Sequence, residues 1–269
     1  MRVLRLLLLL VLLPSNSVFG QQTATPAPKD PQAVSLLTQT LAAAGGAQAV
    51  KAVADFTATG NLTYHWSQDT QGTVTIQGKG GGQLRMDANL PAGVHSWAVN
   101  EGETSLKTES GAISHFPPRD RVIPSSDAFP YQAPMFASSL IFPYGQLVAV
   151  LNNPLFAISY NGVVQVDGHS VHDVQFRRTP PNSDPSGFFA EYHTLDVFID
   201  TTSLQIVMTQ DNVPRHIVHQ LHYSAYTNTD GLFVPLSISE EMGGQHTWDI
   251  RLSGIGFNSG LQDSTFDLQ

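Results

Sequence analysis

The feature that most constrains the fold is an alternation of apolar and polar residues that recurs along the chain after Asp55. From position 56 to 66, apolar residues or glycine occupy the even positions and polar residues the odd ones. Because side chains of a strand alternate between its two faces, this pattern predicts strands with one apolar and one solvated face. Similar runs surround Val74, Leu84, Trp97, Phe156, Leu195, Ile206, Leu221, Leu236 and Trp248.

Turn signals separate these runs and predict how the strands are connected. Glycine-containing pairs such as Asp167-Gly168, Asp230-Gly231 and Gly243-Gly244 are typical of tight hairpins. We therefore expect about eleven antiparallel strands. A twisted sheet that is apolar on one face has to curl round something that covers that face.

Two segments are candidates for that cover. Residues 31–53 show helical spacing of apolar residues, interrupted by Gly45 and Gly46, and predict an N-terminal helix followed by a short second one. Residues 129–155 are strongly apolar, carry no charge and lack strand alternation. We expect this insert to be loop and short helix packed against the apolar face.

The N-terminus predicts export. Residues 1–20 combine two arginines, an apolar run over 6–13 and small residues before a cleavage point after Gly20. That run is too short to span a bilayer, so we expect a cleaved signal peptide and no permanent membrane span. Residues 21–30 are polar and proline-rich and are expected to be a flexible linker. With no later linker, 31–269 is expected to be one domain.

Composition excludes several classes of function. The chain has a net charge of −9, and removal of the signal would leave −11, which disfavours binding to nucleic acid. It contains no cysteine, which excludes disulfides, thiolate metal sites and a lipid-anchored N-terminal cysteine. An exported protein of this kind suits a bacterial periplasm or the cell exterior.

No motif for catalysis is present, and we expect neither enzymatic activity nor a cofactor. There is no G-x-S-x-G and no H-E-x-x-H sequence. His216, His219 and His222 have the spacing of ligands on a helix, but their segment is predicted to be a strand, where His219 faces away from the other two. We expect no metal site, although convergence of His169, His172 and His193 would revive an enzymatic hypothesis.

Short motifs along most of the chain resemble the periplasmic lipoprotein-carrier family, with the LolA/LolB-like fold. The motifs are the Gly45-Gly46-Ala47 break and the segments 78–87, 223–226, 230–235 and 255–261, followed by Phe266. The resemblance implies a half-open β-barrel with a helical lid that holds acyl chains or other apolar ligands. It also implies that Arg85, on an early strand, helps to tie the lid shut. A related branch of the family consists of stress sensors that bind a protein partner.

Together these observations predict an exported protein that binds a lipid or acyl group in the concave cavity of the barrel. The alternative is an envelope sensor that binds a protein without transporting a ligand. A lined cavity and a filled core give the same sequence pattern, so both remain open. The residues expected to line the cavity are large and apolar and lie in phase with the apolar face or in the insert: Trp66, Leu84, Met86, Trp97, Phe136, Leu140, Phe142, Met208 and Trp248.

Overall fold

The computed structural model describes residues 26–269, except for 66–67, 101–102, 117–138, 180–192 and 214–215. The predicted signal peptide, Trp66, Phe136 and the first part of the predicted insert lie outside the described residues. Within the part of the chain that is described, no helix has both the length and the apolar character needed to cross a membrane.

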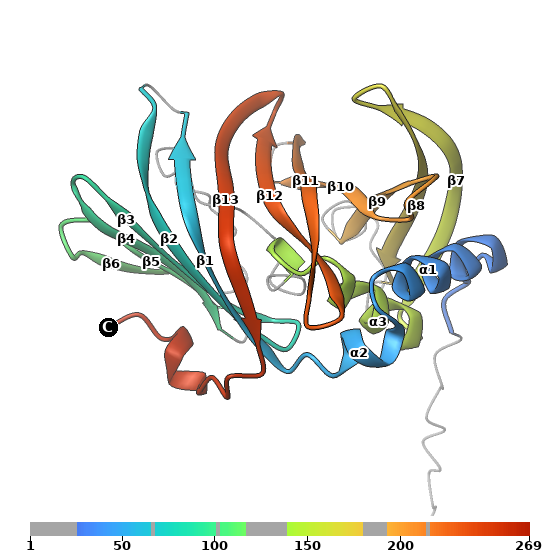
Figure 1. The fold of residues 1–269 in the computed structure, drawn as a ribbon, viewed down its shortest axis with the longest axis horizontal. Helices are drawn as coiled ribbons and strands as arrows, with labels where there is room; N and C mark the ends of the chain where they lie inside the picture. The colour runs from blue at the N-terminus through green and yellow to red at the C-terminus, as the bar shows by residue number, and fades with distance from the viewer. Residues whose placement is uncertain (1–25, 66–67, 101–102, 117–138, 180–192, 214–215) are drawn as a thin grey trace, which may run out of the picture.

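The described residues form a single curved sheet of thirteen antiparallel strands (Figure 1). The sequence predicted about eleven. The short strands β5 and β6 carry too few apolar residues to show alternation. The strands are β1 (Asp55–Tyr64), β2 (Thr70–Lys79), β3 (Gln83–Leu90), β4 (Gly93–Asn100), β5 (Glu103–Lys107), β6 (Ile113–Phe116), β7 (Phe156–Val166), β8 (His169–Arg178), β9 (Thr194–Asp200), β10 (Ile206–Val213), β11 (Ile217–Thr229), β12 (Leu232–Met242) and β13 (Gln245–Phe257).

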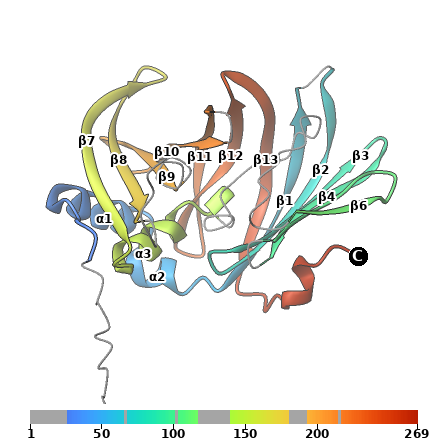
Figure 2. The same cartoon turned by 180° about the vertical axis from the view of Figure 1, so that it is seen from behind.

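The order of the strands explains why the barrel is half-open. Neighbours in the sheet are neighbours in the sequence, with the exception of β1, which pairs with β13. The free edges of the sheet are therefore β6 and β7, and the chain between these two strands contains the insert. Figures 1 and 2 show the sheet curling without closing. This confirms a mainly β, half-open architecture.

The N-terminal helical segment has the predicted break. Helix α1 (Pro31–Ala43) begins after Asp30, whose carboxylate accepts hydrogen bonds from the backbone N–H groups of Gln32 and Ala33. Helix α2 (Ala47–Lys51) follows Gly45 and Gly46, which have φ values of 119° and 104°. A Cβ on Gly45 would lie 2.3 Å from a backbone oxygen, so this turn requires glycine.

The described end of the insert packs into the concave face of the sheet. It consists of a turn at 139–142 and helix α3 (Tyr144–Asn152). Leu140, Ile141, Tyr144, Leu147 and Val150 are each fully shielded from solvent. They join one continuous core with α1, α2 and the apolar residues of the strands. The insert is thus a short helical element against the apolar face, as predicted.

The last residues of the predicted linker are attached to the domain. Residues 27–30 run parallel to the start of β7, with backbone hydrogen bonds between Asp30 and Ile158 and between Ile158 and Pro28. The Lys29 ammonium donates to the backbone oxygens of Val150 and Leu151 at the end of α3, at 3.0 and 2.6 Å. The ordered domain therefore begins before residue 31, because this segment pairs with the free edge of β7.

Candidate functional site

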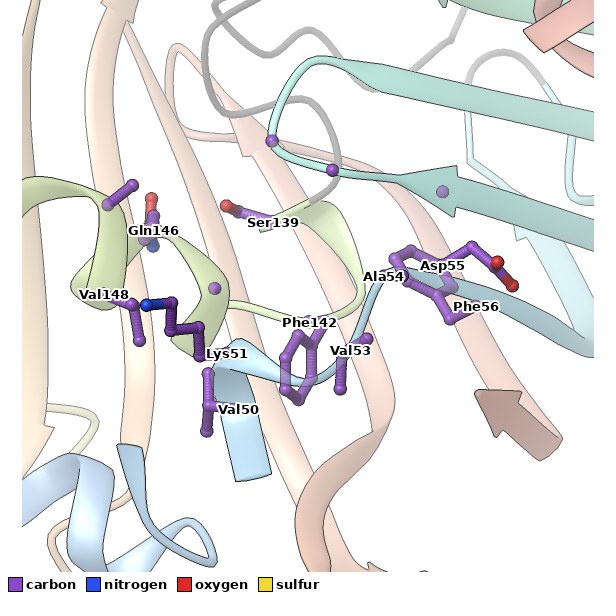
Figure 3. Close-up of a pocket in the computed structure, with 15 residues that line it drawn as sticks. Val50, Lys51, Val53, Ala54, Asp55, Phe56, Ser139, Phe142, Gln146 and Val148 are labelled. Carbon is purple, nitrogen blue, oxygen red and sulfur yellow. The ribbon is translucent and has the colours of Figure 1, made fainter. Parts of the chain in front are cut away.

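A half-open pocket of about 220 Å³ lies where the helices meet the lower end of β1 (Figure 3). The chain from α2 into β1, the turn between β2 and β3, and α3 with its preceding turn form its walls. The volume exceeds the roughly 150 Å³ of an apolar cavity that admits benzene, and is below the roughly 300 Å³ of a typical ligand pocket. The lining residues are Val50, Lys51, Val53, Ala54, Asp55, Phe56, Gly78, Gly80, Gly81, Ser139, Phe142, Gly145, Gln146, Val148 and Ala149.

The polar groups of this pocket are few and differ in character. The Gln146 side chain is buried, and neither atom of its amide has a hydrogen-bond partner among the described residues. Lys51 is exposed at the end of α2. Asp55 is already satisfied, because its carboxylate accepts hydrogen bonds from Ser259, Gly260 and Leu261. The pocket therefore offers apolar walls and one amide that lacks a partner.

Most of the residues predicted to line a cavity belong instead to the filled core. All six that share the concave face or its insert are buried, and Phe142 alone among them lines the pocket: Leu84, Met86, Trp97, Leu140, Phe142 and Trp248. Their predicted orientation is confirmed, since they belong to one core cluster. The side chains of the insert occupy the space in front of the sheet, which the alternation of the strands could not reveal.

Met208 faces the opposite side of the sheet from the predicted one. It packs with Val171 and Phe198 in a small separate cluster. The pairing of β10 with β9 passes from Ile206 opposite Ile199 directly to Met208 opposite Phe198. This β-bulge inserts one extra residue and reverses the side to which later residues point. Met208 therefore does not line the concave face.

Arg85 also lies on the convex face. It stands between Leu84 and Met86, so strand alternation turns it away from the insert. Its guanidinium pairs with Asp87 and donates to the backbone oxygen of Thr265 at 3.0 Å. Among the described residues, Arg85 holds the C-terminal segment rather than the lid, so the role implied by the family resemblance is wrong for this part of the chain.

The three histidines at 216, 219 and 222 confirm the strand prediction. His219 lies on the concave face of β11, and it is fully buried between two acidic side chains. Its ring nitrogens lie 2.7 Å from Asp211 and 2.9 Å from Glu240. Thr247 donates a hydrogen bond to the second oxygen of Glu240. Burial alone would lower the pKa of His219, but the two carboxylates outweigh this effect and raise the pKa to about 10.

His169, His172 and His193 do not converge. His172 hydrogen-bonds to the hydroxyl of Tyr160 at 2.9 Å, near the start of β8. The backbone of His193 pairs with Arg178 at the other end of that strand. Six residues of strand separate these two places, which is about 20 Å. The structure therefore removes the observation that would have revived the enzymatic hypothesis.

A different group of residues could hold a metal ion. His65, His246 and Asp249 each present one ligand atom, and these atoms lie within 4.8 Å of one another. They lie at the upper end of β1, opposite the pocket (Figure 1). Hydrogen bonds from Asp249 and Asp69 raise the pKa of His65, although burial opposes them. The sequence analysis missed this group because its members lie 181 residues or more apart from His65.

The missed pocket residues had one sequence signal. Gln146 is the polar residue inside the apolar stretch of α3, YGQLVAVLN, and a buried amide is costly unless it is paired. The meeting of α2, α3 and the β2–β3 turn had no such signal. Their contact joins segments about 30 to 100 residues apart.

Comparison with known proteins identifies the fold. No family model and no curated protein matches the sequence. A LolA superfamily protein from Nitrosomonas europaea is similar in structure, with 9% identity, a TM-score of 0.56 and coverage of 85% of this chain and 96% of that one. A DUF1329 family protein from Desulfovibrio piger has 11% identity and a TM-score of 0.55, over 88% and 98% of the two chains.

A third solved structure is a putative outer membrane lipoprotein-sorting protein domain from Vibrio parahaemolyticus. It has 11% identity and a TM-score of 0.52, and the match covers 88% of this chain and 96% of that one. At such low identities the likeness concerns the fold, and the three matches span nearly the whole of each structure. The half-open sheet with its helical insert is thus the fold of LolA superfamily proteins, as the sequence motifs predicted.

Proposed function

We propose that this protein is exported and binds or carries a small apolar ligand, such as a lipid or an acyl group. The observation that carries the proposal is the pocket between α2, α3 and the β2–β3 turn. Its walls are mainly aliphatic and aromatic, and it contains one buried amide, that of Gln146, with no partner among the described residues. Ligand pockets typically combine apolar walls with a few polar groups that fix orientation.

The unpartnered amide suggests what chemistry the ligand carries. A buried polar group without a hydrogen bond costs about 1–3 kcal/mol. An ester, amide or carboxyl group on an apolar chain would recover part of that cost by bonding to Gln146. The volume of about 220 Å³ accommodates one end of such a molecule. The rest would extend past the exposed Lys51, whose ammonium could pair with an acidic headgroup.

Export is part of the same proposal. The predicted signal peptide at 1–20 would deliver the protein to the periplasm or the exterior. The fold neighbours include a putative outer membrane lipoprotein-sorting protein domain, whose printed description agrees with such a location. N-terminal sequencing of the exported protein tests this step, and a mature chain that begins at Gln21 is the expected result.

A second candidate function is binding of an envelope protein at the free edge of the sheet. Val163 and Val164 on the edge strand β7 are 54% and 37% exposed. Exposed apolar residues on an unpaired edge favour pairing with a strand of another chain. Replacing Val163 by lysine should abolish capture of such a partner from envelope extracts. Unchanged capture would exclude this edge as the binding surface.

The pocket is tested by filling it. A Cβ on Gly145 would make only an ordinary contact of 3.6 Å with Phe142, so Gly145→Leu extends a side chain into the pocket with little strain on the backbone. We expect its affinity for a fluorescent fatty acid to fall at least tenfold. Gly254→Leu is the matched control, because a Cβ there meets nothing within 4 Å and lies outside the pocket.

The polar contact is tested separately by Gln146→Leu. This variant should bind an apolar probe such as an alkane-linked dye normally and should bind the fatty acid more weakly. Native mass spectrometry of the mildly purified protein should detect a co-purifying lipid. Recovery of ligand-free protein that also ignores both probes would overturn the proposal, as would equal binding by Gly145→Leu and the unmodified chain.

A further inference from the structure

We propose that His65, His246 and Asp249 form a binding site for one divalent transition-metal ion of the zinc type, at the seam between the first and the last strand. The site is independent of the apolar pocket, which lies at the other end of β1. Two imidazole nitrogens and one carboxylate are ligands that Zn²⁺, Co²⁺ and Ni²⁺ accept, whereas Mg²⁺ and Ca²⁺ prefer oxygen ligands.

The geometry already brings the ligand atoms together. The carboxylate of Asp249 lies between the two rings, with one oxygen 3.0 Å from Nε2 of His65 and the other 3.0 Å from Nε2 of His246. The ring centroids of the two histidines are 4.5 Å apart. Both Nε2 atoms therefore point at the same carboxylate. An ion that replaces the shared protons needs only small movements of side chains to bind all three residues.

Asp69 supplies the support that a metal-binding histidine commonly has. Its carboxylate lies 3.0 Å from Nδ1 of His65, the ring nitrogen that faces away from the proposed ion. A carboxylate in this position accepts the Nδ1 proton, leaves Nε2 free to bind metal, and fixes the plane of the ring. Such outer contacts typically change metal affinity by about 10- to 100-fold.

A bulge in β13 is what places His246 in the group. His246 and Asp249 are three residues apart, so in a regular strand they would face opposite sides of the sheet. The pairing with β12 shifts here, with Glu240 opposite Trp248 and Glu241 opposite His246, so that Thr247 is the extra residue. Bulges re-aim side chains in this manner and are common beside functional sites. His246 and Asp249 consequently share a face with His65.

The position of the site suggests what the ion does. The backbone of His65 hydrogen-bonds to Thr247, at the upper end of the β1–β13 pair. This pair joins the beginning of the sheet to its end, so the ion would bridge two strands that are far apart in the sequence. The side chains of His246 and Asp249 are 46% and 35% exposed, which leaves room for a water molecule or another ligand on the ion.

The experiment uses the full chain without an affinity tag. Titration with Zn²⁺ against a chromogenic chelator should show one ion per chain, and Co²⁺ should produce visible absorption bands typical of nitrogen and oxygen ligands. His65→Gln, His246→Gln and Asp249→Asn should each weaken Zn²⁺ binding at least tenfold. Asp69→Asn should weaken it about 10- to 100-fold without changing the stoichiometry.

The matched control is His115→Gln, which removes an exposed histidine paired with Glu103 outside the group. It should bind Zn²⁺ as the unmodified chain does. Zn²⁺ should also raise the unfolding temperature of the unmodified chain and of His115→Gln, but not that of His246→Gln, while Mg²⁺ should raise none of them. Absence of 1:1 binding, or unchanged binding in His246→Gln, would overturn the proposal.

Discussion

At the scale of single residues, buried charge is concentrated around His219. Asp211, His219 and Glu240 lie on three adjacent strands of the concave face, and both ring nitrogens face a carboxylate. Removing one partner of a buried ionic group leaves the other charges without compensation. The cluster therefore stabilises the arrangement of β10, β11 and β12 only while it is complete.

The first prediction follows from that dependence. His219→Gln should lower the free energy of unfolding by about 3–5 kcal/mol, as measured by urea denaturation at pH 7. Because the pKa of His219 is raised to about 10, its contribution should be fully present below pH 6.5 and lost as the pH rises toward 10. His222→Gln, on the convex face, is the control. An equal loss in both variants would contradict the assignment.

Asp55 has the opposite dependence on pH. Burial acts to raise the pKa of its carboxyl group, but hydrogen bonds from Ser259, Gly260 and Leu261 outweigh burial and lower that pKa. Its stabilising contribution should therefore be present above about pH 4 and lost as the pH falls through the lowered pKa. This carboxylate fixes the chain where it leaves β13.

The second prediction concerns this carboxylate. Asp55→Asn should reduce the free energy of unfolding by about 2 kcal/mol at pH 7, because hydrogen bonds to a charged group are replaced by weaker ones. The difference from the unmodified chain should shrink below pH 4, where Asp55 itself becomes neutral. Denaturation curves at pH 7 and pH 3 provide the measurement. A difference that does not depend on pH would show that packing rather than charge matters here.

At the scale of elements, the C-terminal segment covers part of the convex face. The short helix η2 (Asp263–Phe266) contacts β3 and β4, and Phe266 and Leu268 are buried there. Arg85 and Asn100 bind the same segment, through Thr265 and Asp267. This cover explains why Ser96 and Ala98 are buried on the face of β4 that sequence alternation predicts to be solvated.

The third prediction tests that cover. Phe266→Ala should lower the free energy of unfolding by about 3–5 kcal/mol, because it removes a large side chain from a closely packed site. Asp263→Asn, in the same helix, changes an exposed ion pair with Lys79 and should leave the denaturation midpoint nearly unchanged. If both variants had the same midpoint as the unmodified chain, the segment would not be docked in solution.

At the scale of the whole molecule, the β1–β13 pair makes the first and last strands neighbours. Phe56 lies opposite Phe257, about 200 residues later in the chain. Core residues from both wings of the sheet, from the helices and from the insert belong to one cluster. Such long-range pairing favours slow folding and a cooperative structure in which neither wing is stable alone.

The fourth prediction is that the chain unfolds as one unit. Urea transitions followed by tryptophan fluorescence and by far-ultraviolet circular dichroism should coincide, because the seam and the shared core couple all the strands. Trp97 reports on β4 and Trp248 on β13, so Trp97→Phe and Trp248→Phe distinguish the two regions. Two separate transitions would contradict the proposal of a single domain.

The sequence by itself determined the local features of this protein. Alternation over 56–66 or around Trp248 specifies which residues face the core, since the period of a strand is two, and Gly45-Gly46 specifies where the first helix ends. Motifs along the chain were sufficient to predict the LolA-like fold and a helical insert. These signals are readable because they depend on residues only a few positions apart.

The tertiary structure decided everything that depends on distant contacts. Bulges at Val207 and Thr247 turned Met208 away from the core and His246 toward Asp249, and alternation alone predicts the reverse in both cases. The insert filled most of the concave face and moved the pocket to the ends of α2 and α3. The physical reason is that register, filling of space and the meeting of side chains depend on partners that lie up to 200 residues apart.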